Sequence, residues 1–150
     1  MKLTQKQKMF CDYYITSMKL RKSTFRYIEN EIYDHNDTRQ ALFDLEEDII
    51  LSTPPYQEIR TQDPSDPTST AASLLATNKI RMRMIDTIYA IDISFITLSP
   101  EQRDVLEDKY WKRSYLRWID VAMFHRLDKS TVYRWRSSFV EDVAKRLGLY

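Results

Sequence analysis

Residues 116–147 read LRWIDVAMFHRLDKSTVYRWRSSFVEDVAKRL, a pattern that predicts two helices separated by a tight turn. The inner face of the short first helix is expected to hold Trp118, Val121, Ala122 and His125. Ala122 is small, so a second helix can cross there closely. Leu127 is expected to point from the turn into the core, and Asp128 to cap the second helix, where a carboxylate suits the positive end of the helix dipole. This layout is typical of a helix-turn-helix.

The second helix has an apolar face and a polar face. The side chains expected to be buried fall within about 120° of one another on a helical wheel, and they are Val132, Trp135, Phe139, Val143 and Leu147. Ser130, Arg134 and Ser137 are expected to point directly away from them, with Thr131 and Tyr133 beside them and Lys129 at the N-terminus. In a helix-turn-helix these side chains would face the DNA bases. Arg134 suits a bidentate contact with a guanine edge.

A second set of residues is expected to contact phosphates. These side chains precede the first helix of the motif, and they are Lys112, Arg113, Tyr115 and Arg117. Such contacts position a protein on a duplex without reading its sequence. Arg136 falls near the apolar edge of the second helix, so we assign it to a phosphate or to an internal ion pair, and not to a base.

The charge of the chain is segregated along the sequence. Residues 109–136 hold eight basic side chains against Asp120 and Asp128, in a chain whose net charge is only +1. This local excess suits a polyanion such as nucleic acid, although a basic face that meets only water has the same composition. Residues 29–48 hold eight acidic side chains and one basic one, Arg39, which makes them a candidate protein-contact surface.

The rest of the chain is also expected to be helical. Helices are predicted over residues 4–17, 23–34, 36–51 and 70–98, and a further one from Ser99-Pro100-Glu101 to about Trp111. Residues 23–34 and 36–51 are expected to form an antiparallel hairpin. Residues 52–69 contain four of the five prolines and predict a linker.

These elements predict an all-α protein in three parts. Residues 1–51 form an N-terminal helical region and residues 52–69 a Pro-rich linker. Residues 70–150 combine a long central helix with a C-terminal DNA-binding domain.

The composition excludes several classes of protein. The only glycine is Gly148, so Gly-rich phosphate-binding loops and dinucleotide-binding fingerprints are absent. One cysteine (Cys11) and two histidines (His35 and His125) do not fill a zinc site. No nucleophile–base pair is evident, so we expect no enzyme activity, metal, cofactor or small-molecule substrate. No apolar run approaches the about 20 residues of a membrane span and no signal peptide is visible, which favours a cytoplasmic protein.

Most of residues 18–150 resembles a known family. The matching stretches are RKSTFRYIENEIYDHNDTRQ (21–40), DPSDPTSTAASLLATNKIRMRM (63–84), LEDKYW (106–111), RWIDVAMFHRLDKSTVYRWR (117–136) and AKRLGLY (144–150). These resemble the RinA-type phage late-gene transcriptional activators, and the helix-turn-helix looks like region 4 of sigma factors. The resemblance implies promoter binding that switches on packaging and structural genes of temperate phages, with DNA-reading residues between Lys129 and Ser137.

The sequence departs from that family in two places within the motif. His125 or Arg126 stands where such turns commonly have a hydrophilic or glycine residue, and Leu116-Arg117-Trp118 lacks the usual threonine before tryptophan. Residues 1–17 lie outside the match and resemble instead the start of some phage small-terminase subunits. They are either a lineage-specific extension, or Met18 is the native start.

The expected function is therefore sequence-specific binding of double-stranded promoter DNA in the cytoplasm of a bacterial host, with activation of late phage genes. Host RNA polymerase is a candidate second partner. Because one such module covers few base pairs, either a homo-oligomer or a second contact with DNA is expected, and the sequence does not distinguish them. Two alternatives stay open. One is a small-terminase-like protein that recognises DNA for packaging, and the other is a helical protein-interaction module that binds no DNA.

Overall fold

The computed structural model describes residues 20–52 and 67–150, and every regular element in these two ranges is helical. In chain order the elements are α2 (Lys22–Tyr33), α3 (His35–Ser52), α4 (Pro67–Ile96), α5 (Pro100–Glu107), the π-helix η1 (Asp108–Lys112), α6 (Trp118–Phe124) and α7 (Lys129–Arg146). The prediction of an all-α protein is confirmed. The helix expected over residues 4–17, Cys11 and most of the proposed linker lie outside the described residues.

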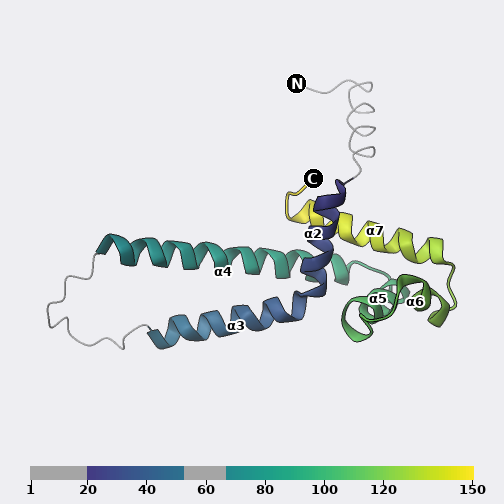
Figure 1. The fold of residues 1–150 in the computed structure, drawn as a ribbon, viewed down its shortest axis with the longest axis horizontal. Coiled ribbons are helices and arrows are strands. Elements are labelled where there is room, and N and C mark those ends of the chain that lie inside the picture. The colour runs from purple at the N-terminus through teal and green to yellow at the C-terminus, as the bar shows by residue number, and fades with distance from the viewer. Residues whose placement is uncertain (1–19, 53–66) are drawn as a thin grey trace, which may run out of the picture.

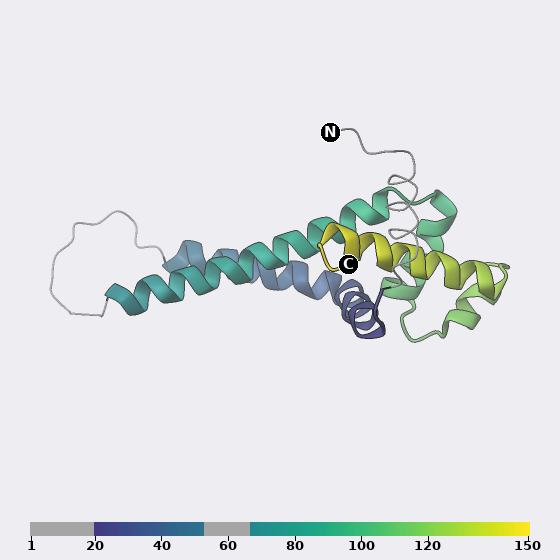
Figure 2. The same cartoon turned by 90° about the horizontal axis from the view of Figure 1, so that it is seen from above.

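The molecule is elongated, with a two-helix hairpin at one end and a helical head at the other (Figure 1). α3 and α4 run side by side in opposite directions, and both views show this pairing (Figure 2). α5, η1, α6 and α7 form the head, and α7 lies against the C-terminal part of α4. The 30 residues of α4 therefore extend from the far end of the hairpin into the head.

The N-terminal helices differ from the expected arrangement. The hairpin predicted between residues 23–34 and 36–51 is wrong, because α2 turns away from α3 at Asp34 and packs instead against α7 (Figure 1). The partner of α3 is α4. The predicted linker thus connects the two arms of a hairpin, and it does not separate two domains.

One hydrophobic core contains residues from both halves of the chain. Ile28 and Ile32 of α2 are completely buried in the same cluster as Ile91 of α4, Val105 of α5 and Phe139 of α7. The predicted N-terminal region and the predicted C-terminal domain therefore share one core. α2 is an integral part of the fold that carries the helix-turn-helix.

The junction between α4 and α5 follows the prediction closely. The Ser99 hydroxyl accepts a hydrogen bond from the backbone N–H of Gln102 at 3.3 Å, and the Gln102 side chain accepts one from the Ser99 N–H at 3.1 Å. Pro100 occupies the first turn of α5, where its missing N–H has no cost. This capping box redirects the chain from the long α4 into the head.

No helix among the described residues combines the length and apolar character needed to cross a lipid bilayer.

Candidate nucleic-acid interface

The helix-turn-helix forms from α6, a four-residue turn (residues 125–128) and α7. The backbone N–H of Leu127 donates to the carbonyl of Ala122 at 2.9 Å, which folds the turn back onto the end of α6. Arg126 adopts a left-handed conformation with φ of 56°, the conformation that glycine adopts most easily. Leu127 packs against the core and Ala122 is buried, as predicted.

Asp128 begins α7 as the predicted N-cap. Its carboxylate accepts a hydrogen bond from the backbone N–H of Ser130 at 3.1 Å and another from the Ser130 hydroxyl. These hydrogen bonds lower the pKa of Asp128, so the cap is ionised at neutral pH. The cap holds the N-terminus of α7 at the tip of the head (Figure 1).

The buried face of α7 is wider than the sequence predicts. Val132, Phe139 and Val143 are buried as expected, but Trp135 and Leu147 are only half-buried. Val140 and Ala144, which the prediction left out, are completely buried. The reason is that α7 packs against α2, α4, α5 and α6, whereas the prediction assumed one buried stripe.

The wider buried face of α7 changes the exposure of one residue that was expected to face the bases. Ser137, predicted to point directly away from the core, is half-buried, and its neighbour Ser138 is exposed instead. Thr131 is also half-buried. The exposed members of the expected set are Lys129, Ser130, Tyr133 and Arg134.

Arg134 is the exposed arginine in the first half of α7. Among the residues that the structure describes, it has no ion pair or hydrogen bond to another side chain. Its guanidinium keeps all five N–H donors available to a ligand. Arg134 is therefore the side chain on α7 best suited to a bidentate contact with a base or a phosphate.

Arg136 has the opposite environment, although it lies only two residues further on. Its guanidinium donates two hydrogen bonds of 2.6 Å to the two carboxylate oxygens of Glu29 in α2. The group also lies over the rings of Phe25 and Trp118, at 5.2 and 5.1 Å from their centroids. Of the two roles expected for Arg136, the structure has the internal ion pair.

Glu29 is the centre of a buried polar network that joins α2 to the head. The Tyr110 hydroxyl donates to the Glu29 carboxylate at 3.1 Å, and burial followed by the charge of Glu29 raises the pKa of Tyr110. Lys109 lies nearby, over the rings of Tyr33 and Trp118, and burial lowers its pKa. The Lys109 ammonium donates to the Ser114 carbonyl at 2.8 Å, which anchors the segment before α6.

The residues expected to contact phosphates lie on this anchored segment. Tyr115 is almost fully exposed. Lys112 pairs with Glu107 at 3.1 Å, and Arg117 pairs with Asp120 at 3.0 Å. Each of these two basic groups therefore already has a carboxylate partner within the chain. Both pairs are exposed to solvent, where such pairs exchange readily with other anions. The hydrogen bonds from Arg117 lower the pKa of Asp120.

Arg113 and His125 connect this segment to the end of α6. The Arg113 guanidinium lies 4.0 Å from the centroid of the Phe124 ring and 4.0 Å from an oxygen of Asp108. The other oxygen of Asp108 contacts His125 Nε2 at 2.7 Å. His125 is thus half-buried and hydrogen-bonded, on the inner side of the motif where the sequence predicted it. The Arg113 guanidinium is in contact with both Phe124 and Asp108.

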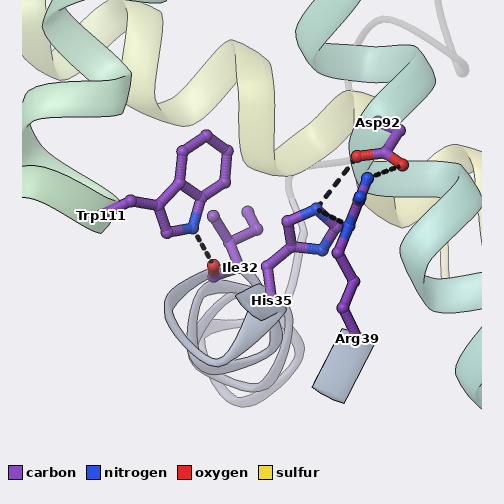
Figure 3. A network of polar contacts seen from close by, with 5 residues as sticks. All are labelled: Ile32, His35, Arg39, Asp92 and Trp111. Carbon is purple, nitrogen blue, oxygen red and sulfur yellow. Dashed lines mark hydrogen bonds and ion pairs between the residues drawn. The ribbon is translucent and has the colours of Figure 1, made fainter. Parts of the chain in front are cut away.

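A second polar cluster joins α3, α4 and η1, and no pattern in the sequence predicts it (Figure 3). His35 begins α3 as a buried residue, and its Nε2 contacts the Asp92 carboxylate at 2.9 Å, while Arg39 pairs with the other oxygen. Burial, together with the charge of Arg39, lowers the pKa of His35 although Asp92 acts in the opposite direction. The Trp111 indole N–H donates to the Ile32 carbonyl at 2.8 Å, and this hydrogen bond joins η1 to the C-terminal end of α2.

Chemically, the exposed side chains of residues 112–117 and of the N-terminal half of α7 offer guanidinium, ammonium and hydroxyl donors. The described residues contain no group of three or more histidine, cysteine, aspartate or glutamate side chains placed to hold a metal ion.

Comparison with known proteins identifies a family. A family model described as "Protein of unknown function (DUF722)" matches residues 7–145. No curated protein and no solved structure matches the chain.

Proposed function

The chain belongs to the DUF722 family, and on the geometry of its helix-turn-helix we propose that it binds duplex promoter DNA in a sequence-specific manner and activates late genes of a bacteriophage. The observation that carries the proposal is the contrast between Arg134 and Arg136. The Arg136 guanidinium is hydrogen-bonded to Glu29 inside the fold. The Arg134 guanidinium is exposed on the recognition helix and has no partner among the described residues.

In this proposal α7 enters the major groove with its N-terminal half. Lys129, Ser130, Tyr133 and Arg134 face the bases, and Ser138 is exposed further along the same helix, where Ser137 is half-buried. Thr131 lies at the edge of this surface. Sequence preference comes chiefly from Arg134, because the other exposed side chains form single and less directional hydrogen bonds.

In this proposal the segment before α6 contacts the sugar–phosphate backbone. Lys112, Tyr115 and Arg117 make these contacts, and Arg113 contributes its charge from its position over Phe124. Phosphate oxygens replace Glu107 and Asp120 as partners of Lys112 and Arg117. Binding therefore weakens as the salt concentration rises.

The assignment to late-gene activation rests on the resemblance to the RinA-type activators described above. In that role the protein acts in the cytoplasm of a bacterial host and contacts host RNA polymerase at the promoter. The acidic outer surface of α3 is a candidate for that contact.

The test is in vitro selection of duplexes by the full chain, followed by fluorescence anisotropy on the selected duplex and a scrambled one. Arg134→Ala is expected to lose about 1–3 kcal/mol of the preference for the selected duplex, the value of one bidentate base contact. The dependence of affinity on salt should change by no more than about one phosphate equivalent.

Lys145→Ala is the matched control, because Lys145 is an exposed cation at the far end of the same helix. It should keep the preference of the wild type. If no duplex binds at low salt, the DNA proposal fails and the chain is a protein-interaction module. If the wild type binds but selects no sequence, the proposal of sequence-specific promoter binding fails. A ring-shaped oligomer seen by light scattering would favour the packaging alternative.

A further inference from the structure

A row of exposed apolar side chains follows α4 at intervals of seven residues. Leu75, Met82, Tyr89 and Ile96 are between 46% and 65% exposed. Seven residues are close to two helical turns, so the four side chains lie on one side of the helix. A monomeric protein rarely exposes four large apolar side chains along one side of a helix unless another molecule covers them.

α3 carries two more exposed apolar side chains with the same spacing, Phe43 at 58% and Ile50 at 71%. At about 100° per residue, both rows lie about 70–90° away from the side where α3 and α4 meet, in the same rotational sense. In an antiparallel pair of helices, this displacement puts both rows on one face of the hairpin. We call this face, formed by Phe43, Ile50, Leu75, Met82, Tyr89 and Ile96, the hairpin face.

We propose that the hairpin face binds the hairpin face of a second copy of the chain, with a twofold axis along the hairpin. A surface pairs with itself about a twofold axis only when it is self-complementary. In this arrangement α3 of one copy lies over α4 of the other, and the two heads are at the same end. The hairpin face meets this requirement in both apolar contacts and charge.

The register within the hairpin shows which apolar residues would meet. The Glu46–Arg81 pair, at 2.7 Å, and the His35–Asp92 pair, at 2.9 Å, fix the level of α3 against α4. By that register Phe43 lies near the level of Met82, and Ile50 near the level of Leu75. The proposed axis keeps these levels, so Phe43 packs against the partner copy's Met82, and Ile50 against its Leu75.

Charge complementarity follows from the same register. Glu47 and Lys79 are exposed at the outer edges of the hairpin face, one on each helix, and they lie at nearly the same level. The twofold axis brings Glu47 of one copy beside Lys79 of the other, and the pair occurs twice. A hairpin reversed end to end would not align these charges.

The area is sufficient for a stable dimer. The row on α4 spans about 32 Å at 1.5 Å per residue, and two packed helices are about 20 Å wide, which gives roughly 600 Å² per copy. Two copies would bury about 1,200 Å², the lower end of the range for specific interfaces. A cavity of about 490 Å³ between α3 and α4, lined by Ile50 and Leu74 among others, leaves room for side chains of the partner.

The experiment measures the mass of the full chain in solution by sedimentation equilibrium, without DNA. The wild type is expected to be a dimer at micromolar concentration, and Met82→Glu a monomer, because the substitution puts a charge in the apolar contact. The matched control is Ile80→Glu. Ile80 is also an exposed apolar residue of α4, 53% accessible, but it lies on the opposite side of the helix, so this variant should remain dimeric.

The charged pair tests the orientation. Glu47→Lys and Lys79→Glu should each weaken the dimer, and the double variant should restore it. A monomeric wild type, or a dimer that survives Met82→Glu, would overturn the proposal, and failure of the double variant to restore the dimer would overturn the orientation. Circular dichroism confirms that each variant stays helical. Because no DNA is present, these outcomes are independent of the proposed function.

Discussion

At the scale of single residues, the two arginines of α7 show how the packing of neighbours divides one residue type into two roles. Helical periodicity alone puts Arg134 and Arg136 about 200° apart. Which of the two arginines is held inside the fold depends on Glu29, a residue of α2 more than a hundred positions earlier that pairs with Arg136. The sequence pattern identified Arg134 as exposed and left two roles open for Arg136, because the pairing with α2 is not a local feature.

Arg136→Ala is expected to destabilise the fold. The substitution leaves the buried Glu29 carboxylate without its bidentate partner, and breaking a pair of this kind costs about 3 kcal/mol. The free energy of unfolding from urea denaturation measures the loss. Arg134→Ala, an exposed substitution, should stay within about 0.5 kcal/mol of the wild type. Equal stability of the two variants would refute the separation of roles.

His35 gives the fold a dependence on pH. Burial holds its pKa below the value of about 6.5 that it has in the unfolded chain. Between the two values the unfolded chain binds a proton that the folded protein does not. Stability is therefore fully present above about pH 6.5 and is lost as the pH falls toward the folded pKa.

His35→Gln should reduce this dependence, because an amide can still donate to Asp92 and does not titrate. The measurement compares urea midpoints of the wild type and the variant at about pH 7.5 and about pH 5.5, on either side of the unfolded pKa. The wild type should lose more stability than the variant on acidification. An equal loss in both proteins would assign the pH dependence to other groups.

At the scale of elements, caps and periodic apolar residues predicted where most helices begin. Ser99 and Asp128 each cap the helix expected of them, and the ends of α2 and α6 agree with the prediction to within a residue or two. The burial of Val140 and Ala144 was missed because a helical wheel has no information on how many neighbours a helix has. For the same reason the helical wheel predicts an exposed Ser137, whereas Ser137 is half-buried and Ser138 is exposed in the structure.

The turn between α6 and α7 allows a prediction about backbone conformation. Arg126 has a positive φ, which costs a residue with a side chain roughly 1 kcal/mol and costs glycine little. Arg126→Gly should therefore be as stable as the wild type or slightly more stable, with unfolded-chain entropy offsetting part of the gain. Arg126→Val should be clearly less stable, because a branched side chain suits this conformation least. Thermal melting distinguishes them, and a valine variant that melts with the wild type would contradict the assigned turn.

At the scale of the whole molecule, the order of elements in space differs from their order along the chain. A Pro-rich segment between two helical regions suggested a domain boundary, yet it joins the arms of a hairpin. Local patterns predict helices well because each helix is stabilised by neighbours in sequence. They do not predict that α2 packs on α7, since that choice depends on Ile28, Ile32 and Glu29 meeting partners far away.

A fragment of residues 70–150 is therefore expected not to fold as an independent domain. Removing α2 would expose the face of α7 that Ile28 and Ile32 cover and leave Arg136 without Glu29. The fragment should show helical signal but no cooperative urea transition, in contrast to the full chain. A sharp transition with the stability of the full chain would show that the head is autonomous, as the sequence first suggested.

The most direct test of the DNA-binding surface is NMR mapping of backbone amides during titration with a duplex of about two helical turns. We expect shifts to concentrate in residues 112–117 and 128–138, and to disappear as salt is raised. The far end of the α3–α4 hairpin should be unaffected. Shifts confined to that hairpin, or no shifts with any duplex at low salt, would contradict the proposal that this helix-turn-helix binds DNA.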